Sequence, residues 1–297
     1  MLREKLQRGE FVITAEITPP LAASRDAVLK RAEPLAGIAD AVNVTDAASA
    51  RVSVSSIAAA AILAAAGIEP VAQVTCRDRN RIALASDLLG AAALGVENFL
   101  ILHGDDPKAG DMPEARPVYD LDSRAVIALA RDMRDLGTLP SGREIDPRPD
   151  FHIGCADTPI DPGDDWLPTT LAAKSAAGAD FVQTQFCFDV AVAKRYFARL
   201  KEAGITARLK FIVGVGPLLS LRQARFMNDG LFGVSIPPAV MERLEAAGDE
   251  RAEGQAICIE LMASLAAIDG VAGVHVMAPM QSARAVADII KASGLRT

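Results

Sequence analysis

The chain has 297 residues, a length that suits one large α/β domain. Hydrophobic residues make up 51% of it, aromatic residues only 4%, and the formal net charge is −7. This acidic balance argues against a nucleic-acid-binding protein, which needs a basic surface to neutralise phosphates, and against a polybasic membrane anchor.

No apolar run is long enough to cross a bilayer, and the N-terminal segment MLREKLQRGE lacks the apolar core of a signal peptide. The four cysteines are far apart and form no CxxC pair, and together with three scattered histidines they show no metal-ligand spacing. Free thiols are typical of a reducing compartment. We therefore expect a soluble, metal-free, cytoplasmic protein.

Short apolar runs alternate with segments of helical periodicity along the whole chain. Several of the helical segments end at a glycine, such as Gly67, Gly95, Gly178 or Gly204, the residue favoured at a left-handed C-cap. This rhythm is typical of repeated βα units. The expected strands are, in chain order, 11–17, 41–45, 70–75, 98–103, 151–155, 181–185, 210–215 and 272–277.

Eight βα units predict a (β/α)₈ TIM barrel that spans residues 1–297 as a single domain. A doubly wound open sheet is the alternative, because a strand count from sequence can be wrong by one or two. No GxGxxG follows the first strand, as a dinucleotide-binding open sheet would require, so the barrel is favoured. The longest irregular stretches are 104–121 and 135–150, and the second, rich in Pro, Gly and charge, predicts a flexible loop.

Polar residues gather at the ends of the expected strands, where a barrel of this kind places its active site. Loops are generally polar, and this explains a residue such as Asp46. It explains less well the polar residues inside apolar runs, where an unpaired polar group costs about 1–3 kcal/mol. These residues, which favour a site over a structural role, are Glu16, Gln73, Gln183 and Gln185.

Two motifs lie in the following loops. In HGDDP, Gly104 permits a sharp turn that would hold Asp105 over the barrel mouth, although a turn-forming Asp is the simpler interpretation. In CRDRNR, Arg77, Arg79 and Arg81 lie at a helix start and predict either a phosphate clamp or an exposed helix cap. Lys174, taken alone, is typical of a solvated helix face.

Five segments resemble the methylenetetrahydrofolate reductase family, in the family's order and spacing. They cover almost the whole chain: AEITPP, DAVNVTDAASARVSVSS, VAQVTCRDRNRIALASDLLGAAALGVENFLILHGDDP, KSAAGADFVQTQFCFD and VSIPPAVMERL. The resemblance implies a barrel that binds a flavin, FAD with FMN as the alternative. It also implies reduction of 5,10-methylenetetrahydrofolate to 5-methyltetrahydrofolate by NADH or NADPH, or the reverse oxidation. Members of the family are often homo-oligomers.

The same resemblance implies roles for individual residues. Glu16 matches the acid that assists opening of the methylene bridge at N10, and Asp105 the Asp between flavin and folate. Gln185, with Gln183 beside it, matches the Gln that contacts folate and nicotinamide. The expected cofactor contacts are Thr45, Asn43, Gln73, His103, Gly104, Asp105, Cys155, Lys174, Arg77 and Arg79.

Three departures from the family pattern keep alternatives open. Gln73 replaces a His, the segment 153–159 replaces a flavin-contacting Tyr-Pro-Glu-x-His-Pro segment, and Leu221, our candidate folate contact, replaces a Phe. Direct hydride transfer without a flavin therefore stays open. The rivals are a pterin-binding barrel that passes a methyl group to a corrinoid or thiol, and a non-catalytic folate-binding subunit. Retention of Glu16, Asp105 and Gln185 together argues against the non-catalytic subunit.

Overall fold

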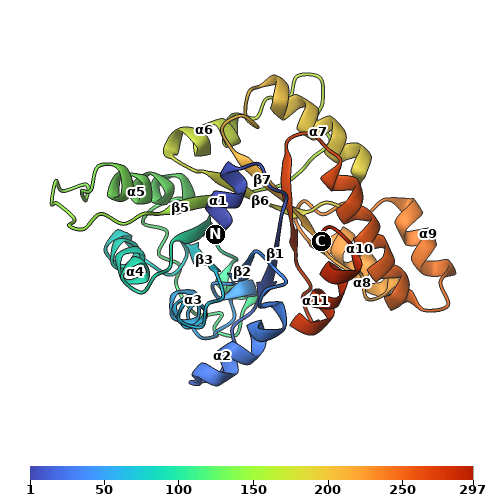
Figure 1. Ribbon diagram of the computed structural model, residues 1–297, viewed down its shortest axis with the longest axis horizontal. Helices are drawn as coiled ribbons and strands as arrows, with labels where there is room; N and C mark the ends of the chain where they lie inside the picture. The colour runs from blue at the N-terminus through green and yellow to red at the C-terminus, as the bar shows by residue number, and fades with distance from the viewer. Residues whose placement is uncertain (297) are drawn as a thin grey trace.

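Eight parallel strands close in sequential order into a barrel, and helices surround it (Figure 1). This computed structural model describes residues 1–296. The (β/α)₈ prediction is confirmed and the open-sheet alternative is wrong, because β1 pairs with β8 as well as with β2. The strands are β1 Val12–Ile17, β2 Ala41–Val44, β3 Pro70–Thr75, β4 Asn98–Leu102, β5 His152–Asp157, β6 Phe181–Phe186, β7 Lys210–Val215 and β8 Val271–Val276.

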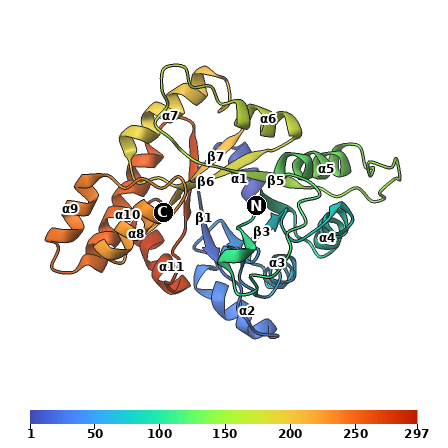
Figure 2. The same cartoon turned by 180° about the vertical axis from the view of Figure 1, so that it is seen from behind.

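Most helices begin at a Ser, Asn or Asp whose side chain accepts a hydrogen bond from a first-turn N–H, as at Ser55, Asn80, Asp122 and Ser220. Figure 2 shows α8, α9 and α10 grouped on one side of the barrel. The helices are α1 Leu2–Gln7, α2 Arg25–Ala32, α3 Ser56–Ala65, α4 Arg81–Ala93, α5 Ser123–Asp135, α6 Thr169–Ala177, α7 Val190–Glu202, α8 Leu221–Gly230, α9 Pro238–Ala246, α10 Glu250–Ala266 and α11 Ala283–Ala292, with short 3₁₀ turns η1 Glu33–Leu35, η2 Ala48–Ala50 and η3 Pro107–Ala109.

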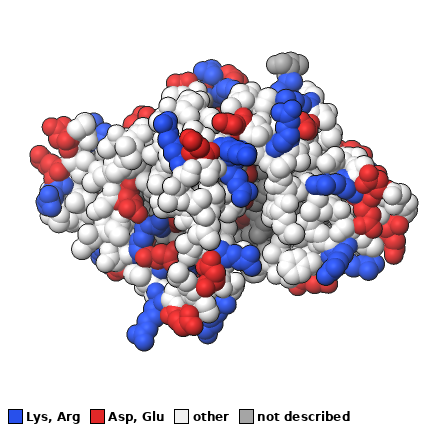
Figure 3. Space-filling view, turned by 90° about the horizontal axis from the view of Figure 1, so that it is seen from below, with Lys and Arg blue, Asp and Glu red and all other residues white. Residues whose placement is uncertain are grey.

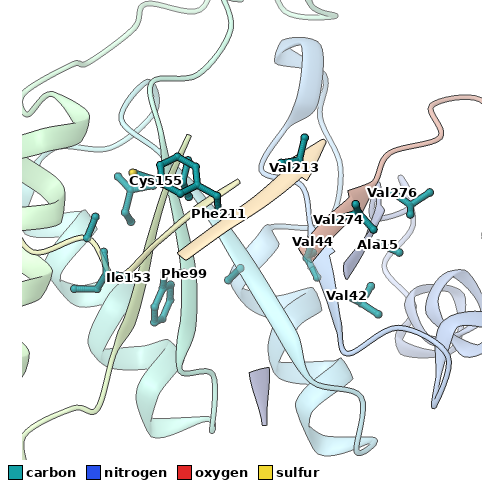
Figure 4. Packing of buried hydrophobic residues seen from close by; sticks show 14 of the residues in the cluster. Ala15, Val42, Val44, Phe99, Ile153, Cys155, Phe211, Val213, Val274 and Val276 are labelled. Atoms are coloured by element: carbon teal, nitrogen blue, oxygen red, sulfur yellow. The ribbon is translucent and has the colours of Figure 1, made fainter. Parts of the chain in front are cut away.

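Side chains along each strand alternate between two environments. One set points outward and packs under the helices as the main hydrophobic core, which includes Val42, Val44, Phe99 and Val213 (Figure 4). The other set points into the barrel. The residues that point inward near the carboxyl ends of the strands therefore determine which chemical groups line the barrel mouth.

The lower end of the barrel interior is closed by α1. Leu2 and Leu6, 0% and 1% exposed, join the inward residues Val12, Phe181 and Ile212 in a separate apolar cluster. Figure 1 accordingly shows α1 projected over the centre of the barrel. With α1 in this end, the barrel interior opens at the upper end, at the carboxyl termini of the strands.

The two expected irregular stretches are irregular here as well. Residues 104–121 contain only η3, and the segment after α5 contains one isolated antiparallel bridge, between Thr138 and Glu144. Its flexibility stays a prediction. No helix within residues 1–296 is long and apolar enough to cross a membrane. Basic and acidic side chains are interspersed over the face drawn in Figure 3.

Candidate active site

A cavity of about 820 Å³ lies at the carboxyl ends of the strands, where the sequence predicts the site. Its wall takes residues from β1, β3, β6 and β8 and from the loops that follow β2, β4 and β5. Nine of the predicted site residues line it: Glu16, Thr45, Gln73, His103, Gly104, Asp105, Lys174, Gln183 and Gln185.

Glu16 faces this cavity from the end of β1. Its Oε2 accepts a hydrogen bond from Gln73 Nε2 at 2.9 Å and lies 3.7 Å from His275 Nε2. The Glu16 side chain is 24% exposed, whereas His275 is 3% exposed. The carboxyl group is therefore oriented by Gln73, lies near His275 and is still accessible from the cavity.

Beneath Glu16, a hydrogen-bonded chain crosses the barrel interior. Asn43 Nδ2 donates to Gln183 Oε1 at 2.5 Å, Gln183 Nε2 donates to Thr14 Oγ1 at 3.2 Å, and Thr14 Oγ1 lies 2.9 Å from His275 Nδ1. Because Thr14 Oγ1 accepts from Gln183, its hydroxyl hydrogen is free to point at His275 Nδ1. That arrangement leaves the ring proton of His275 on Nε2, facing Glu16.

Asp105 is exposed at the mouth, on the loop after β4. Its Oδ2 accepts a hydrogen bond from the backbone N–H of Ser49, at 2.7 Å. Gly104 has φ of +98°, and a Cβ at this position would lie 2.9 Å from Arg77 Cβ. The turn that presents Asp105 thus requires glycine, as the HGDDP motif predicts.

The loop after β2 that touches Asp105 is strained. Ala47, Ser49 and Ala50 have φ of 48°, 54° and 55°, a region that non-glycine residues seldom adopt. Two carboxylates hold the loop from outside, Asp105 at Ser49 N and Asp111 at Val52 N. Strain held in place by neighbouring groups is characteristic of ligand-binding sites.

Thr45, at the end of β2, has a hydroxyl that is buried and unpartnered. The residue is 2% exposed, and its Oγ1 has no hydrogen-bond partner within the described part of the chain. A buried polar group of this kind is normally satisfied, and Thr45 lines the cavity. Its hydroxyl is therefore available to a bound molecule.

The β5–α6 side of the cavity holds a second polar group of residues. Lys174 Nζ donates to the carbonyl of Ala156 at 2.5 Å, and the Asp157 carboxylate accepts a hydrogen bond from the Tyr196 hydroxyl. Burial raises the pKa of Asp157, against the opposing effects of Tyr196 and Lys174. Neither Asp157 nor Tyr196 is among the site residues predicted from the sequence.

Comparison with known proteins decides the family. A profile of methylenetetrahydrofolate reductase matches residues 1–294. The chain belongs to the methylenetetrahydrofolate reductase family. The resemblance found in the sequence motifs is thereby confirmed.

One relative within this family is a Caenorhabditis elegans protein named probable methylenetetrahydrofolate reductase (NADPH). It is 26% identical over 255 residues, which is 82% of this chain and 35% of that protein. The chain therefore spans about a third of the length of that relative.

Solved structures share the barrel. A Clostridium thermocellum protein described as binding two copies of 5-methyl-5,6,7,8-tetrahydrofolic acid superimposes with a TM-score of 0.63 at 16% identity, covering 99% of this chain and 98% of that one. DmoA from Hyphomicrobium sulfonivorans superimposes with a TM-score of 0.53 at 11% identity, covering 95% of this chain and 87% of that one. At these identities the likeness concerns the fold.

The arginines of CRDRNR are not presented to the cavity of this reductase-family barrel. Arg79 binds Asp46 through two hydrogen bonds of 2.7 and 3.0 Å, and Arg77 binds Asp78 at 2.7 Å. Burial alone would raise the pKa of Asp46, but hydrogen bonds from Arg79 and Thr75 outweigh it and hold that pKa below its usual value. The phosphate-clamp interpretation is therefore replaced by a set of ion pairs that brace the loops.

Three other predicted contacts lie away from the cavity. Cys155 points outward into the core under the helices (Figure 4), and burial raises its pKa to about 12. Leu221 begins α8 and packs on a cluster that includes Phe186 and Leu218. Asn43 lies below the cavity and supports Gln183. Cys155 and Leu221 are therefore packing residues, and Asn43 supports Gln183. The prediction that these three residues contact the cofactor or the folate is corrected accordingly.

His275 also lines the cavity, although the sequence does not predict it as a site residue. It occupies an inward position on β8, between Val274 and Val276, which pack outward. In the sequence VHV a polar residue lies between two apolar ones, as Glu16 does on β1. This pattern predicts a polar side chain that points into the barrel. Among residues 1–296, no group of three His, Cys, Asp or Glu side chains is arranged to hold a metal ion.

Proposed function

We propose that this chain reduces 5,10-methylenetetrahydrofolate to 5-methyltetrahydrofolate with electrons from NADH or NADPH. The observation that carries the proposal is the position of Glu16, oriented by Gln73 and close to His275, in the wall of a cavity that Asp105 also lines. Membership of the methylenetetrahydrofolate reductase family supports it. So does the folate-binding neighbour among solved structures, whose barrel this chain shares over nearly its full length.

The reaction requires a proton donor. The methylene bridge joins N5 and N10 of the folate, and its N10–CH₂ bond must break to leave a 5-iminium cation. A protonated Glu16 would give its proton to N10 as that bond breaks. Hydride addition at the methylene carbon of the iminium then yields the N5-methyl group. Solvent that reaches the partly exposed carboxyl group would restore its proton afterwards, with the Nε2–H of His275 nearby.

Asp105, Gln183 and Gln185 are assigned to stabilising the iminium cation and binding the pterin. The exposed Asp105 carboxylate would stabilise the positive charge that develops on the iminium. Gln183 and Gln185 offer amide donors and acceptors to the polar edge of a pterin. Gln185 is held by two backbone contacts, donating to Phe232 O at 3.4 Å and accepting from Phe186 N at 3.0 Å.

The cofactor that we propose for this cavity is a flavin nucleotide, FAD with FMN as the alternative. The unpartnered Thr45 hydroxyl is free to bind the ring system, and Leu100, Leu102 and Ala156 give the wall an apolar part. Lys174 is positioned to hold a phosphate. When bound, a flavin would accept a hydride from the nicotinamide and pass it to the folate.

The test is turnover by the purified protein. We expect oxidation of NAD(P)H that depends on methylenetetrahydrofolate, with 5-methyltetrahydrofolate identified by mass. Flavin absorption bands in the protein, or their gain after incubation with FAD or FMN, would support the flavin route, and turnover by a colourless protein would point to direct hydride transfer.

A protein that consumes no NAD(P)H with folate in either direction would refute the proposal. Transfer of a methyl group from 5-methyltetrahydrofolate to a thiol or a corrinoid, without nicotinamide, would establish the rival activity instead.

A further inference from the structure

A second pocket lies at the end of the barrel opposite the active-site cavity, and the proposed reaction does not use it. It has a volume of about 360 Å³ and lies beside α1, at the amino ends of β5, β6 and β7. Although the chain is acidic, with a formal net charge of −7, the residues of 1–296 that line this pocket include four cations and two acids. The cations are Arg3, Arg134, Arg208 and Lys210, and the acids are Asp150 and Asp180.

The two acids are each bound to an arginine of the pocket. Arg3 Nη1 donates to Asp150 Oδ1 at 2.6 Å, and Arg134 Nη1 donates to Asp180 Oδ2 at 2.7 Å. These two ion pairs leave the other two cations of the lining without neutralisation.

Neither Arg208 nor Lys210 has an acidic partner within residues 1–296. Arg208 Nε donates to the carbonyl of Gly204 at 3.3 Å, which is its one side-chain hydrogen bond in the described chain. Lys210 begins β7, is half-buried and lines the pocket with no hydrogen bond or ion pair from its ammonium group to those residues. A guanidinium and an ammonium group without counter-ions in one pocket favour an anion there.

His152 gives an independent indication of a ligand in this pocket. It lines the pocket, is 5% exposed and donates from Nδ1 to Asn98 Oδ1 at 2.9 Å. Its Nε2 therefore carries a lone pair, and this atom has no hydrogen-bond partner within residues 1–296. Burial lowers the pKa of His152 to about 3, so the ring is neutral near pH 7. Because buried acceptors are normally satisfied, Nε2 requires a hydrogen-bond donor from the pocket.

The two requirements together define the chemistry of the ligand. The cations require negative charge, whereas the imidazole requires a proton donor. Sulfate has no proton to donate, and a phosphate monoester has lost its last one at about pH 8, because its second pKa is about 6. Inorganic phosphate at this pH is an anion that still has one protonated oxygen, so it meets both requirements.

We propose that this pocket is a binding site for inorganic phosphate, held by Arg208 and Lys210 and donating a hydrogen bond to Nε2 of His152. The site is separate from the reaction, and the inference does not depend on the proposed function. A phosphate bound there would link the amino ends of β5 and β7 beside α1, and it should therefore stabilise the fold.

The experiment is isothermal titration calorimetry of the purified chain at about pH 8 and constant ionic strength, so that general screening stays the same. We expect saturable binding of inorganic phosphate with a Kd of about 1 mM or lower. Sulfate and glycerol 3-phosphate should bind about tenfold more weakly or less, because each would place an acceptor against an acceptor at His152 Nε2. No saturable binding of phosphate, or equal affinity for the three anions, would overturn the proposal.

Substitutions locate the bound phosphate. Arg208→Gln and Lys210→Gln should each raise the Kd for phosphate by about five- to tenfold, since each removes a charge-assisted contact. Arg222→Gln and Lys30→Gln are the matched controls, because they make the same changes at exposed residues outside the pocket and should keep the wild-type Kd. An unchanged Kd in Arg208→Gln and Lys210→Gln, or an equal rise in the controls, would contradict the inference.

The active-site cavity is the alternative location for a phosphate, at Lys174. Lys174→Gln removes that cation and should leave the Kd measured for inorganic phosphate within about twofold of the wild-type value. If Lys174→Gln abolishes the binding and Arg208→Gln does not weaken it, the phosphate binds in the cavity and the second site is refuted.

Discussion

At the scale of single residues, the site depends on the two-residue alternation of the strands. On β1, Ile13, Ala15 and Ile17 pack outward in the core, so Thr14 and Glu16 must face the interior. The same alternation carries His275 inward on β8. The acid and the imidazole meet because closure pairs Thr14 of β1 with His275 of β8.

The role of Glu16 can be separated from binding by one substitution. Glu16→Gln keeps the size of the side chain and an oxygen that can accept from Gln73, but it removes the transferable proton. We expect reduction of methylenetetrahydrofolate to fall by about 10²–10⁴-fold, the usual contribution of a general acid. Oxidation of NAD(P)H by the flavin-loaded protein in the absence of folate should persist, as measured by stopped-flow absorbance.

Glu10→Gln is the control, because Glu10 is exposed and binds Arg8 outside the cavity. Folate reduction at the wild-type rate in Glu16→Gln would show that the proton comes from elsewhere.

A buried histidine makes stability depend on pH. His152 is 5% exposed, donates from Nδ1 to Asn98 Oδ1 at 2.9 Å, and has its pKa lowered to about 3 by burial, with Arg3 and Arg134 adding to the effect. The unfolded chain binds a proton near pH 6.5 and the folded chain does not, so stability falls as pH drops below 6.5. From pH 7 to pH 5 the expected loss is about 2 kcal/mol.

Urea unfolding across this range measures the loss. His152→Gln should flatten the dependence, whatever its own effect on stability at pH 7. An equally steep loss in the variant would assign the pH dependence to other groups.

Strand alternation was sufficient to predict from the sequence several of the residues that line the cavity. Glu16, Gln73 and Gln183 were recognisable because each interrupts an apolar run at an inward position. Cys155 was misplaced by one position, since its neighbour Ala156 is the residue that lines the cavity. The pairing of Arg79 with Asp46 was not predictable, because the two residues are 33 positions apart and their contact depends on how two loops fold together.

At the scale of elements, α1 shows how a short helix can be held by tertiary contacts. Six residues are too few for a stable isolated helix. Leu2 and Leu6 fix it by entering the lower end of the barrel. The sequence shows only a charged N-terminal segment. It does not predict that α1 closes the barrel, because two leucines among charged residues give little helical periodicity.

The packing of α1 in the barrel leads to a prediction. A substitution that weakens it should lower the stability of the fold but leave the cavity intact. Leu6→Ala should lower the free energy of unfolding by about 2–5 kcal/mol, because it leaves a cavity among Leu2, Phe181 and Ile212. Leu21→Ala, at a position 78% exposed, is the control and should change it by less than about 0.5 kcal/mol. Denaturant unfolding measures both.

Ligand binding by the folded fraction of Leu6→Ala should be unchanged, since α1 lies at the end of the barrel opposite the cavity. A variant as stable as the wild type would mean that α1 is dispensable for closing the barrel.

At the scale of the whole molecule, closure of the sheet is what assembles the site. Glu16 and His275 are separated by nearly the whole chain, and Asp105 and Gln185 come from intermediate βα units, yet all four line one cavity. Counting βα units predicts this convergence. It does not predict the strained loop after β2 or its attachment to Asp105, because these follow from contacts between loops and not from the order of elements.

Because the cavity wall draws on so many strands, a ligand bound there should stabilise the entire fold. We expect 5-methyltetrahydrofolate at a hundred times its Kd to raise the free energy of unfolding by about 2.7 kcal/mol and the thermal midpoint by several degrees. Asp105→Asn should reduce this shift, since Asp105 faces the cavity. Asp106→Asn should retain it, because Asp106 caps η3 outside the cavity wall. A thermal midpoint that does not respond to folate at any concentration would exclude this barrel as a folate-binding site, and differential scanning fluorimetry decides the matter.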